Sequence, residues 1–174
     1  ALIGKLNDQA RSALEGAAGL CLSRTHYDIE IEHFLTKMLE SQASDFAKIV
    51  KHFGIDKSRL TGELMRSMDK LKSGNARTPA ISPSVLKMLT QAWTIGSINF
   101  NASQVRTGFT ILALVTDEEL ARITREISRE FQKIQPEALR NEFAKIVADS
   151  SEETVTAFAD SEGAPAAPGR AIGG

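Results

Sequence analysis

Three side chains that could ligate a metal crowd together at the start of one helical stretch. Glu30, Glu32 and His33 lie close in sequence, and carboxylate and imidazole groups are common zinc ligands. A zinc-binding helix carries a second histidine at i+4, but residue 37 is a lysine. Cys21 lies among apolar residues and is more typical of a small buried side chain than of a ligand. We therefore favour a structural role for Glu32 and His33, as the opening of a helix whose dipole attracts a carboxylate, over a metal site.

The sequence contains no recognisable motif for covalent catalysis or for nucleotide hydrolysis. A phosphate-binding loop needs Gly-x-x-x-x-Gly-Lys-Ser/Thr, which is absent. The histidines are scattered, and no serine or cysteine lies in a recognisable nucleophile turn. The sequence therefore predicts a fragment without catalytic residues, cofactor or metal of its own. A helical enzyme with an unrecognised site is the alternative of another class, and a stoichiometric metal or cofactor in the purified chain would favour it.

Length and composition limit the remaining classes of function. The chain has 174 residues, of which 42% are hydrophobic and 25% charged, which suffices for one domain with a hydrophobic core. The formal net charge is −1 without a run of like charges, so neither nucleic acid nor a membrane is an expected partner. No apolar run approaches the length of a membrane span. A single cysteine fits a reducing compartment, and we expect a cytoplasmic protein. Ala1 in place of methionine suggests a processed or excised fragment.

The predicted helices occur in two copies along the chain. When the chain is shifted by about 75 residues, the apolar positions of its first half fall on those of its second half, as expected when duplicated helical units bury the same face. The matched positions of the leading helices are Leu6, Ala10, Leu14, Ala17 and Cys21 in the first copy and Ile81, Val85, Leu89, Ala92 and Gly96 in the second. With one further residue of offset, the next matched positions are Ile29, Leu35, Met38 and Leu39 in the first copy and Val105, Ile111, Leu114 and Val115 in the second.

Apolar spacing and capping residues predict helices throughout, and no segment has the two-residue alternation of a strand. Asn7 and Ser82 are expected to cap the leading helices, with Pro83 in the first turn of the second one. Gly54 is expected to end a helix in a left-handed conformation. The predicted helices cover about residues 8–21, 31–40, 46–53, 57–72, 83–93, 107–114, 120–131 and 139–147. The predicted fold class is all-α, with repeat 1 at about residues 6–72 and repeat 2 at about 81–148.

The composition changes beyond Asp149. Residues 150–153 are polar and acidic, and residues 163–169 consist of glycine, alanine and proline, which is typical of a flexible linker. We therefore expect a domain over residues 1–149 and a linker over residues 150–174. The short run 155–158 is apolar enough to dock on another surface.

Apolar residues in front of the two leading helices exceed what the helical stripes require. Leu2, Ile3 and Leu6 precede Asn7, and Ile81 stands directly before Ser82. If the two copies pack about a pseudo-twofold axis, their leading helices approach each other. We then expect these residues to line a shared hydrophobic groove that accepts the apolar side of a partner helix.

One stretch of the chain resembles a known repeat. The residues Ile29-Glu30-Ile31-Glu32-His33-Phe34-Leu35-Thr36-Lys37-Met38-Leu39-Glu40 resemble the motif that opens the second helix of each Clp repeat, where a Glu-His pair precedes a leucine-rich run. With the duplication and the linker, the chain resembles the complete amino-terminal domain of a Clp/Hsp100 AAA+ protein over about residues 5–148. Leu6-Asn7, residues 37–40 and residues 105–108 resemble the ClpV branch, the ATPases of type VI secretion systems.

The resemblance implies a double Clp repeat of eight helices, joined by the linker to hexameric AAA+ rings that use ATP and magnesium. It implies a non-catalytic domain that recognises the amino-terminal helix of the large sheath subunit, so that the rings can disassemble and recycle contracted sheaths. The alternative within the family is the domain of a general Clp unfoldase or disaggregase, which binds unfolded segments or an adaptor.

The resemblance also implies which residues line the groove. By position, Leu6 and Ile81 match the family's groove-lining sites most directly, and helical geometry extends the set to Leu2, Ile3, Ala10 and Leu86. The second copy has Gly108-Phe109 where the first has Glu32-His33. Disaggregase-type domains carry an acidic residue at the position of Gly108. Its absence weakens the general unfoldase hypothesis and leaves Phe109 as an apolar wall of the groove.

Overall fold

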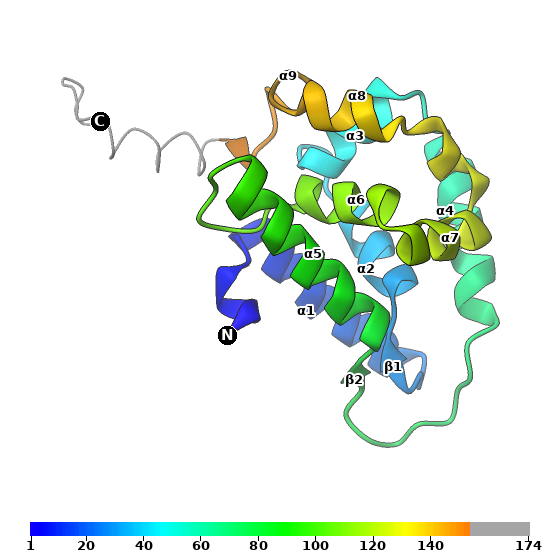
Figure 1. Cartoon of the computed structure of the whole chain (residues 1–174). Helices are drawn as coiled ribbons and strands as arrows, with labels where there is room; N and C mark the ends of the chain where they lie inside the picture. Colours follow the sequence, from blue (N-terminus) through cyan, green and yellow to red (C-terminus); the bar gives the residue numbers. More distant parts are fainter. Residues whose placement is uncertain (154–174) are drawn as a thin grey trace.

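Helices form most of the domain, and the longest are the two leading helices of 16 and 17 residues. A computed structural model describes residues 1–153, which contain nine α-helices, two 3₁₀-helices and two short strands (Figure 1). The first repeat consists of η1 (Leu2–Lys5), α1 (Asp8–Ser23), β1 (Asp28–Ile29), α2 (Ile31–Met38), α3 (Asp45–His52) and α4 (Lys57–Asp69). The second consists of β2 (Ala80–Ile81), α5 (Pro83–Asn99), α6 (Thr107–Thr116), α7 (Glu118–Ile127), η2 (Arg129–Lys133), α8 (Pro136–Asn141) and α9 (Phe143–Ile146). The predicted all-α class is confirmed.

The end of repeat 2 departs from the predicted helices. Helix α7 ends at Ile127 because Ser128 is extended, with φ −158° and ψ 132°, and its hydroxyl accepts a hydrogen bond from Glu130 N as the cap of η2. The predicted last helix is divided into α8 and α9, since Glu142 leaves helical geometry with φ −115° and ψ 23°. The two-residue strands β1 and β2 were not predicted, because they are too short for any alternation to be visible.

Side-chain caps start the leading helices where the sequence predicts them. Asn7 Oδ1 accepts a hydrogen bond from Ala10 N at 2.9 Å, and Ser82 Oγ accepts one from Val85 N at 3.1 Å. Gly54 has φ +67° and follows the end of α3, so the left-handed stop is also confirmed. Local sequence thus determines where these helices begin and end.

The two copies are related by matching strand contacts at the two ends of α1 and α5. Leu6 forms a parallel bridge with Val105, and Ile29 of β1 pairs in parallel with Ile81 of β2. The segment before α1 therefore pairs with the segment after α5, and the segment after α1 pairs with the one before α5. Helices α1 and α5 consequently run antiparallel, side by side along one edge of the domain (Figure 1).

Helix α6 forms the centre of one continuous hydrophobic core that both repeats share. All its residues from Thr107 to Leu114 are buried, and α3, α5, α7 and α8 pack around it (Figure 1). Phe46 of α3 stacks on Phe131 of η2 with ring centroids 6.5 Å apart, which joins the outer ends of the two repeats. No helix within residues 1–153 is long and apolar enough to cross a membrane.

The domain extends past the predicted boundary at residue 149. Ser150 and Glu152 are 4% and 2% exposed, and Ser151 N donates a hydrogen bond to Ala43 O at 2.7 Å. Residues 150–153 therefore belong to the folded domain and not to the linker. The remainder of the predicted linker, including the run 155–158, lies outside the described residues.

Candidate functional site

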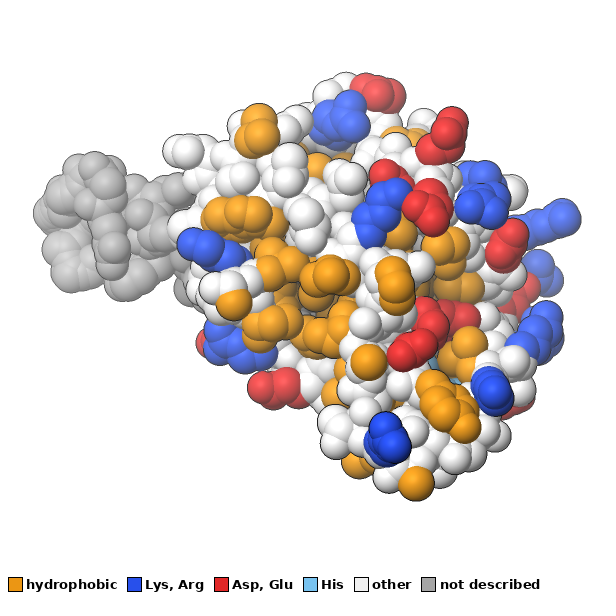
Figure 2. Space-filling model, turned by 60° about the horizontal axis from the view of Figure 1, so that its bottom comes forward, with side chains coloured by type: hydrophobic (Ala, Val, Ile, Leu, Met, Phe, Trp, Pro, Cys, Tyr) orange, Lys and Arg blue, Asp and Glu red, His pale blue; other side chains and the backbone are white. Residues whose placement is uncertain are grey.

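An apolar surface follows α5 from η1 to β2. We call it the α5 stripe, and its members are Leu2, Ile3, Trp93, Leu86 and Ile81. Ile3, Leu86 and Ile81 are 40%, 52% and 39% exposed, and Leu2 and Trp93 are half-buried. Trp93 and Leu86 lie two helical turns apart and so share one side of α5. Figure 2 turns this side of the domain toward the viewer and shows hydrophobic side chains gathered in the middle of the face.

The short helix η1 supplies one end of the α5 stripe. It packs against α5, and the Lys5 ammonium lies 5.0 Å from the centre of the Trp93 ring, within the range of a cation–π contact. The backbone of the same residue is also fixed, since Val105 N donates to Lys5 O at 2.7 Å. Both contacts hold the Lys5 end of η1, and the packing of η1 against α5 places Leu2 and Ile3 on the same face as α5.

Three of the predicted groove residues lie in the core. Leu6 and Ala10 are 0% exposed and Phe109 is 1% exposed. Leu6 is covered because it lies in the bridge to Val105, and Ala10 is covered because it is on the inner side of α1. Phe109 packs against both Phe100 and Phe143, with ring-centroid distances of 5.3 Å, and those two rings also contact each other. The prediction that these three side chains line an open groove is wrong.

The predicted proximity of Leu6 and Ile81 is also wrong. The pseudo-twofold axis makes α1 and α5 antiparallel, so residues that precede the two helices lie at opposite ends of the pair. An α-helix rises 1.5 Å per residue, which separates these ends by about 24 Å along α1. Of the predicted groove residues, the structure exposes Ile3, Ile81 and Leu86 and partly exposes Leu2.

Sequence reasoning missed Trp93 as a surface residue. Its place in the apolar stripe of α5 indicated the core, whereas the structure leaves it half-buried beside η1. The available signal was the residue type, since tryptophan is large and seldom fully buried. Its indole offers a wide apolar surface at the border between core and solvent.

The acidic and histidine cluster proves to be a capping arrangement. The Glu30 side chain accepts a hydrogen bond from His33 N, and His33 Nδ1 accepts one from Glu30 N at 2.8 Å, which forms a capping box at the start of α2. His33 Nε2 therefore carries the proton and donates to His26 Nδ1 at 2.8 Å. The Glu32 carboxylate accepts a hydrogen bond from Ser67 Oγ at 2.7 Å. Both ring nitrogens of His33 are thus engaged within the domain, and residues 1–153 hold no cluster of three possible metal ligands.

Burial favours the neutral forms of His33, His26 and Cys21. Burial, followed by the nearby charges of His26 and Arg24, lowers the pKa of His33 to about 4. The pKa of His26 is also lowered, chiefly by burial. Burial raises the pKa of the Cys21 thiol to about 11. Cys21 is buried, as the sequence predicts, and is a protonated thiol rather than a nucleophile.

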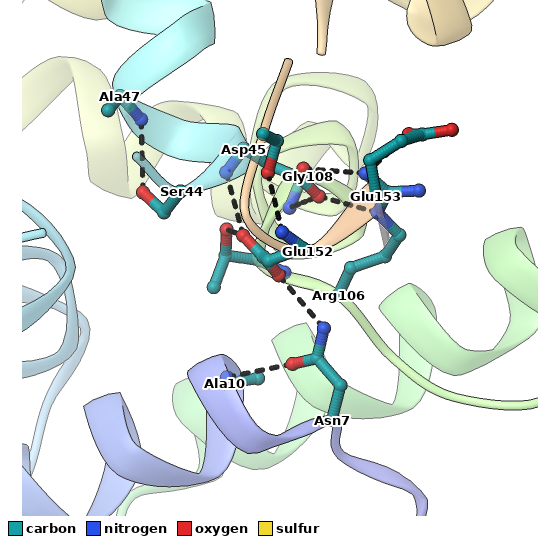
Figure 3. A network of polar contacts seen from close by, with 11 residues as sticks. Asn7, Ala10, Ser44, Asp45, Ala47, Arg106, Gly108, Glu152 and Glu153 are labelled. Carbon is teal, nitrogen blue, oxygen red and sulfur yellow. Dashed lines mark hydrogen bonds and ion pairs between the residues drawn. The ribbon is translucent and has the colours of Figure 1, made fainter. Parts of the chain in front are cut away.

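A second polar cluster is buried where α3 and α6 begin (Figure 3). Arg106 Nε and Nη2 donate to the two oxygens of Asp45, each at 2.7 Å, and Nη2 also donates to Glu153 at 3.1 Å. Gly108 N donates to Asp45 Oδ2 at 3.1 Å. A Cβ atom at Gly108 would lie 2.5 Å from a ring carbon of Phe143 and 2.9 Å from Asp45 Oδ2. A larger side chain at this position, including an acidic one, would therefore require Phe143 or Asp45 to shift.

Glu152 is the centre of this cluster. Its Oε1 accepts hydrogen bonds from Asn7 Nδ2 at 3.0 Å and Thr107 N at 2.7 Å, and its Oε2 accepts from Asp45 N at 2.7 Å and Thr107 Oγ1. One carboxylate thus joins the starts of α1, α3 and α6 (Figure 3). Burial and the charge of Asp45 raise the pKa of Glu152, and the hydrogen bonds from Thr107 and Asn7 oppose that rise.

Comparison with known proteins agrees with this architecture. The family described as Clp repeat (R) N-terminal domain matches residues 5–127. The AAA+ ATPase ClpV1 of Pseudomonas aeruginosa is 35% identical over 173 residues, which make up 99% of this chain but only 19% of ClpV1. The chain therefore spans about a fifth of the length of that relative.

Solved structures resemble the domain over most of its length. The N-domain of ClpV from Vibrio cholerae superposes with a TM-score of 0.77 at 30% identity, covering 87% of this chain and 90% of that one. A ClpV N-domain in complex with a VipB peptide superposes with a TM-score of 0.72 at 31% identity, covering 87% and 92%. The resemblance found in the sequence is confirmed, and the chain belongs to the family of Clp repeat N-terminal domains, with the N-domains of ClpV ATPases among its relatives.

Proposed function

We propose that this domain is a non-catalytic receptor that binds the amino-terminal helix of the large sheath subunit of a type VI secretion system. The observation that carries the proposal is the α5 stripe, an exposed apolar surface on a domain whose fold matches a ClpV N-domain complexed with a VipB peptide. An amphipathic helix has the right shape and chemistry for such a surface, since it presents apolar side chains at i, i+3, i+4 and i+7.

A few contacts would supply the affinity. Fully burying one aliphatic anchor contributes about 1.5–3 kcal/mol, and a small number of central residues usually dominates binding. Trp93 is suited to such a role because η1 and Lys5 already restrict its side chain. Leu86 lies two turns from Trp93 on the same side of α5, and Ile3 belongs to η1, which packs against α5, so both offer exposed anchoring surfaces to a bound helix.

The wider role depends on the parent protein. We place the domain in front of AAA+ rings that bind ATP and magnesium, in the bacterial cytoplasm, and that disassemble contracted sheaths. A hexameric parent would display six copies of the domain, so modest affinity per copy would suffice through the raised local concentration.

Titration with sheath peptide tests the proposal. The 174-residue chain is titrated with a labelled peptide spanning the amino-terminal helix of the large sheath subunit encoded near the parent gene, and with the VipB peptide. We expect Ile3→Glu and Trp93→Ala to weaken binding at least about tenfold, equivalent to about 1.4 kcal/mol. The control is Met65→Glu, because Met65 is 53% exposed on α4, outside the α5 stripe. Equal affinity of all four proteins would remove the α5 stripe from consideration.

A competition experiment distinguishes a sheath receptor from the domain of a general Clp unfoldase. A general unfoldase domain would release the sheath peptide when a permanently unfolded protein is added in excess, whereas a dedicated sheath receptor would retain it. The closed space at Gly108, where disaggregase-type domains carry an acidic side chain, supports the dedicated receptor.

A further inference from the structure

The segment Ser150–Glu153 joins the end of the domain to its beginning. Ser151 is hydrogen bonded to Ala43, and Glu153 to Arg106. Glu152 reaches Asn7, 145 positions away in sequence. We call these four residues the exit segment, since every later residue of the chain is attached to the domain through them.

Asn7 connects the exit segment to η1. Its Oδ1 caps α1 through Ala10 N at 2.9 Å, while its Nδ2 donates to Glu152 at 3.0 Å, so both ends of the amide are engaged. Its backbone N donates to Val105 O at 2.9 Å. Helix η1 ends two residues before Asn7, and Val105 contacts both Asn7 and Lys5, so the position of Asn7 is coupled to the end of η1.

The hydrogen-bonding capacity of Glu152 explains why this link is strong. A carboxylate only accepts hydrogen bonds, and all four of its ordinary acceptor positions have donors here. The donors come from the starts of three helices, whose free N–H groups favour a negative charge. Removing the carboxylate would leave several buried donors without an acceptor, which is more costly than losing one exposed hydrogen bond.

We propose that Glu152 is a positioning residue that holds η1 on α5, so that the α5 stripe is complete only while the exit segment is docked. This inference rests on the proposed function. Displacement of the exit segment would break the Asn7–Glu152 hydrogen bond and leave Asn7 its contacts with Ala10 and Val105, which would loosen η1 and shift Leu2 and Ile3 on α5. The partner peptide and the docked exit segment would therefore stabilise each other, because coupling between two sites is reciprocal.

The test compares two neighbouring glutamates in the 174-residue chain. Glu152→Gln keeps the shape of the side chain but replaces one accepting oxygen with an NH₂ group, which must then face donors. Glu153→Gln is the matched control, because Glu153 is 36% exposed and contacts Arg106 but not Asn7. We expect Glu152→Gln to raise the dissociation constant for the sheath peptide at least about fivefold and Glu153→Gln to leave it within about twofold. Without peptide, hydrogen exchange in residues 2–7 should be faster in Glu152→Gln alone.

A general loss of stability must be separated from this effect. Leu64→Ala removes a core contact on α4, away from η1, and is expected to lower the free energy of unfolding without changing exchange in residues 2–7. Peptide binding to the wild-type chain is expected to slow exchange of the amides of residues 151–153.

Each outcome bears on one proposal. Wild-type affinity together with wild-type exchange in Glu152→Gln would overturn the positioning role. If that variant does not fold, the wild-type experiment decides, and an exit segment whose exchange ignores the peptide overturns the role. If the wild-type chain binds no sheath peptide, the proposed function fails, while exchange in residues 2–7 still reports whether Glu152 holds η1.

Discussion

The second helix of each repeat, α2 in the first and α6 in the second, begins at an equivalent position but is capped differently. In α2 the cap is local, since Glu30 and His33 exchange hydrogen bonds across one turn. In α6 the residue at the place of Glu30 is Arg106, which provides no side-chain cap. The first N–H groups of α6 donate instead to Glu152 and Asp45, which come from the exit segment and from repeat 1.

Burial accounts for this difference. Helix α6 is buried along most of its length, whereas α2 keeps Glu32, Thr36 and Lys37 partly exposed. Water cannot satisfy the free N–H groups of a helix that starts in the core, and buried carboxylates take its place. Duplication therefore preserved the helix but not the source of its cap, and the long-range cap makes repeat 2 depend on other parts of the domain.

The largest effect is expected where the ion pair that supports the long-range cap is broken. Arg106→Ala leaves Asp45 buried without its bidentate partner, and we expect the free energy of unfolding to fall by about 3–5 kcal/mol. Urea denaturation measures the change. Arg140→Ala, which removes an exposed ion pair with Glu137, is the control and should change the free energy of unfolding by less than about 0.5 kcal/mol. Comparable losses in the two variants would contradict the importance of the buried cap.

This contrast also explains what could be predicted from the sequence. Local signals fixed the caps at Asn7 and Ser82, the stop at Gly54 and the matched apolar positions of the two copies, because each depends on residues within one turn or on helical spacing. The role of Glu152 was missed, because its partners lie between 45 and 145 positions away. In the sequence it is one of two adjacent glutamates in a polar stretch, which favours a linker.

The candidate site was partly predictable for the same reason. Pseudo-symmetry correctly matched Leu6 with Ile81 and Ile29 with Val105, but it did not reveal that α1 and α5 run antiparallel. Helix direction follows from how the ends of α1 and α5 pair in space, which spacing along the chain does not encode. The exposed apolar residues before α1 were recognised as unusual, and their grouping with Trp93 required the position of η1 on α5.

We expect the stabilising contribution of His33, in the local cap of repeat 1, to be lost at acidic pH. The pKa of His33 is about 4 in the folded state and about 6.5 when unfolded, so the unfolded chain binds a proton first as pH falls. The contribution of neutral His33 is complete above pH 6.5 and is lost between about pH 6.5 and 4, up to about 3 kcal/mol. Urea denaturation across this range measures it.

The difference between wild type and His33→Leu isolates this contribution. Glu30 and Glu152, whose pKa values burial raises, gain relative stability as pH falls and are present in both proteins. The wild type should lose stability more steeply than His33→Leu from pH 6.5 to 4, while His52→Gln, at an exposed position, should follow the wild type. Parallel profiles for wild type and His33→Leu would show that His33 is not held neutral.

A smaller effect is expected from crowding the start of α6. Gly108→Ala places a methyl group 2.5 Å from the Phe143 ring, and we expect a loss of about 1–3 kcal/mol in the free energy of unfolding. Gly62→Ala is the matched control, since nothing lies within 4 Å of its added Cβ in the exposed middle of α4. That substitution should stabilise the domain by about 0.5–1 kcal/mol. A stable Gly108→Ala variant would show that Phe143 and Asp45 can move apart.

The smallest effect is expected where the cap is local. Glu30→Ala removes the carboxylate that accepts from His33 N, and loss of an N-cap typically costs about 1 kcal/mol. The cost stays low because His33 N also donates to the backbone Glu30 O at 3.1 Å, so the buried N–H group keeps an acceptor. Urea denaturation of Glu30→Ala beside Arg106→Ala therefore compares equivalent positions of the two copies directly. A loss for Glu30→Ala as large as that for Arg106→Ala would mean that the local cap of α2 stabilises the domain as much as the ion pair that supports the cap of α6, which would contradict the proposed difference in dependence.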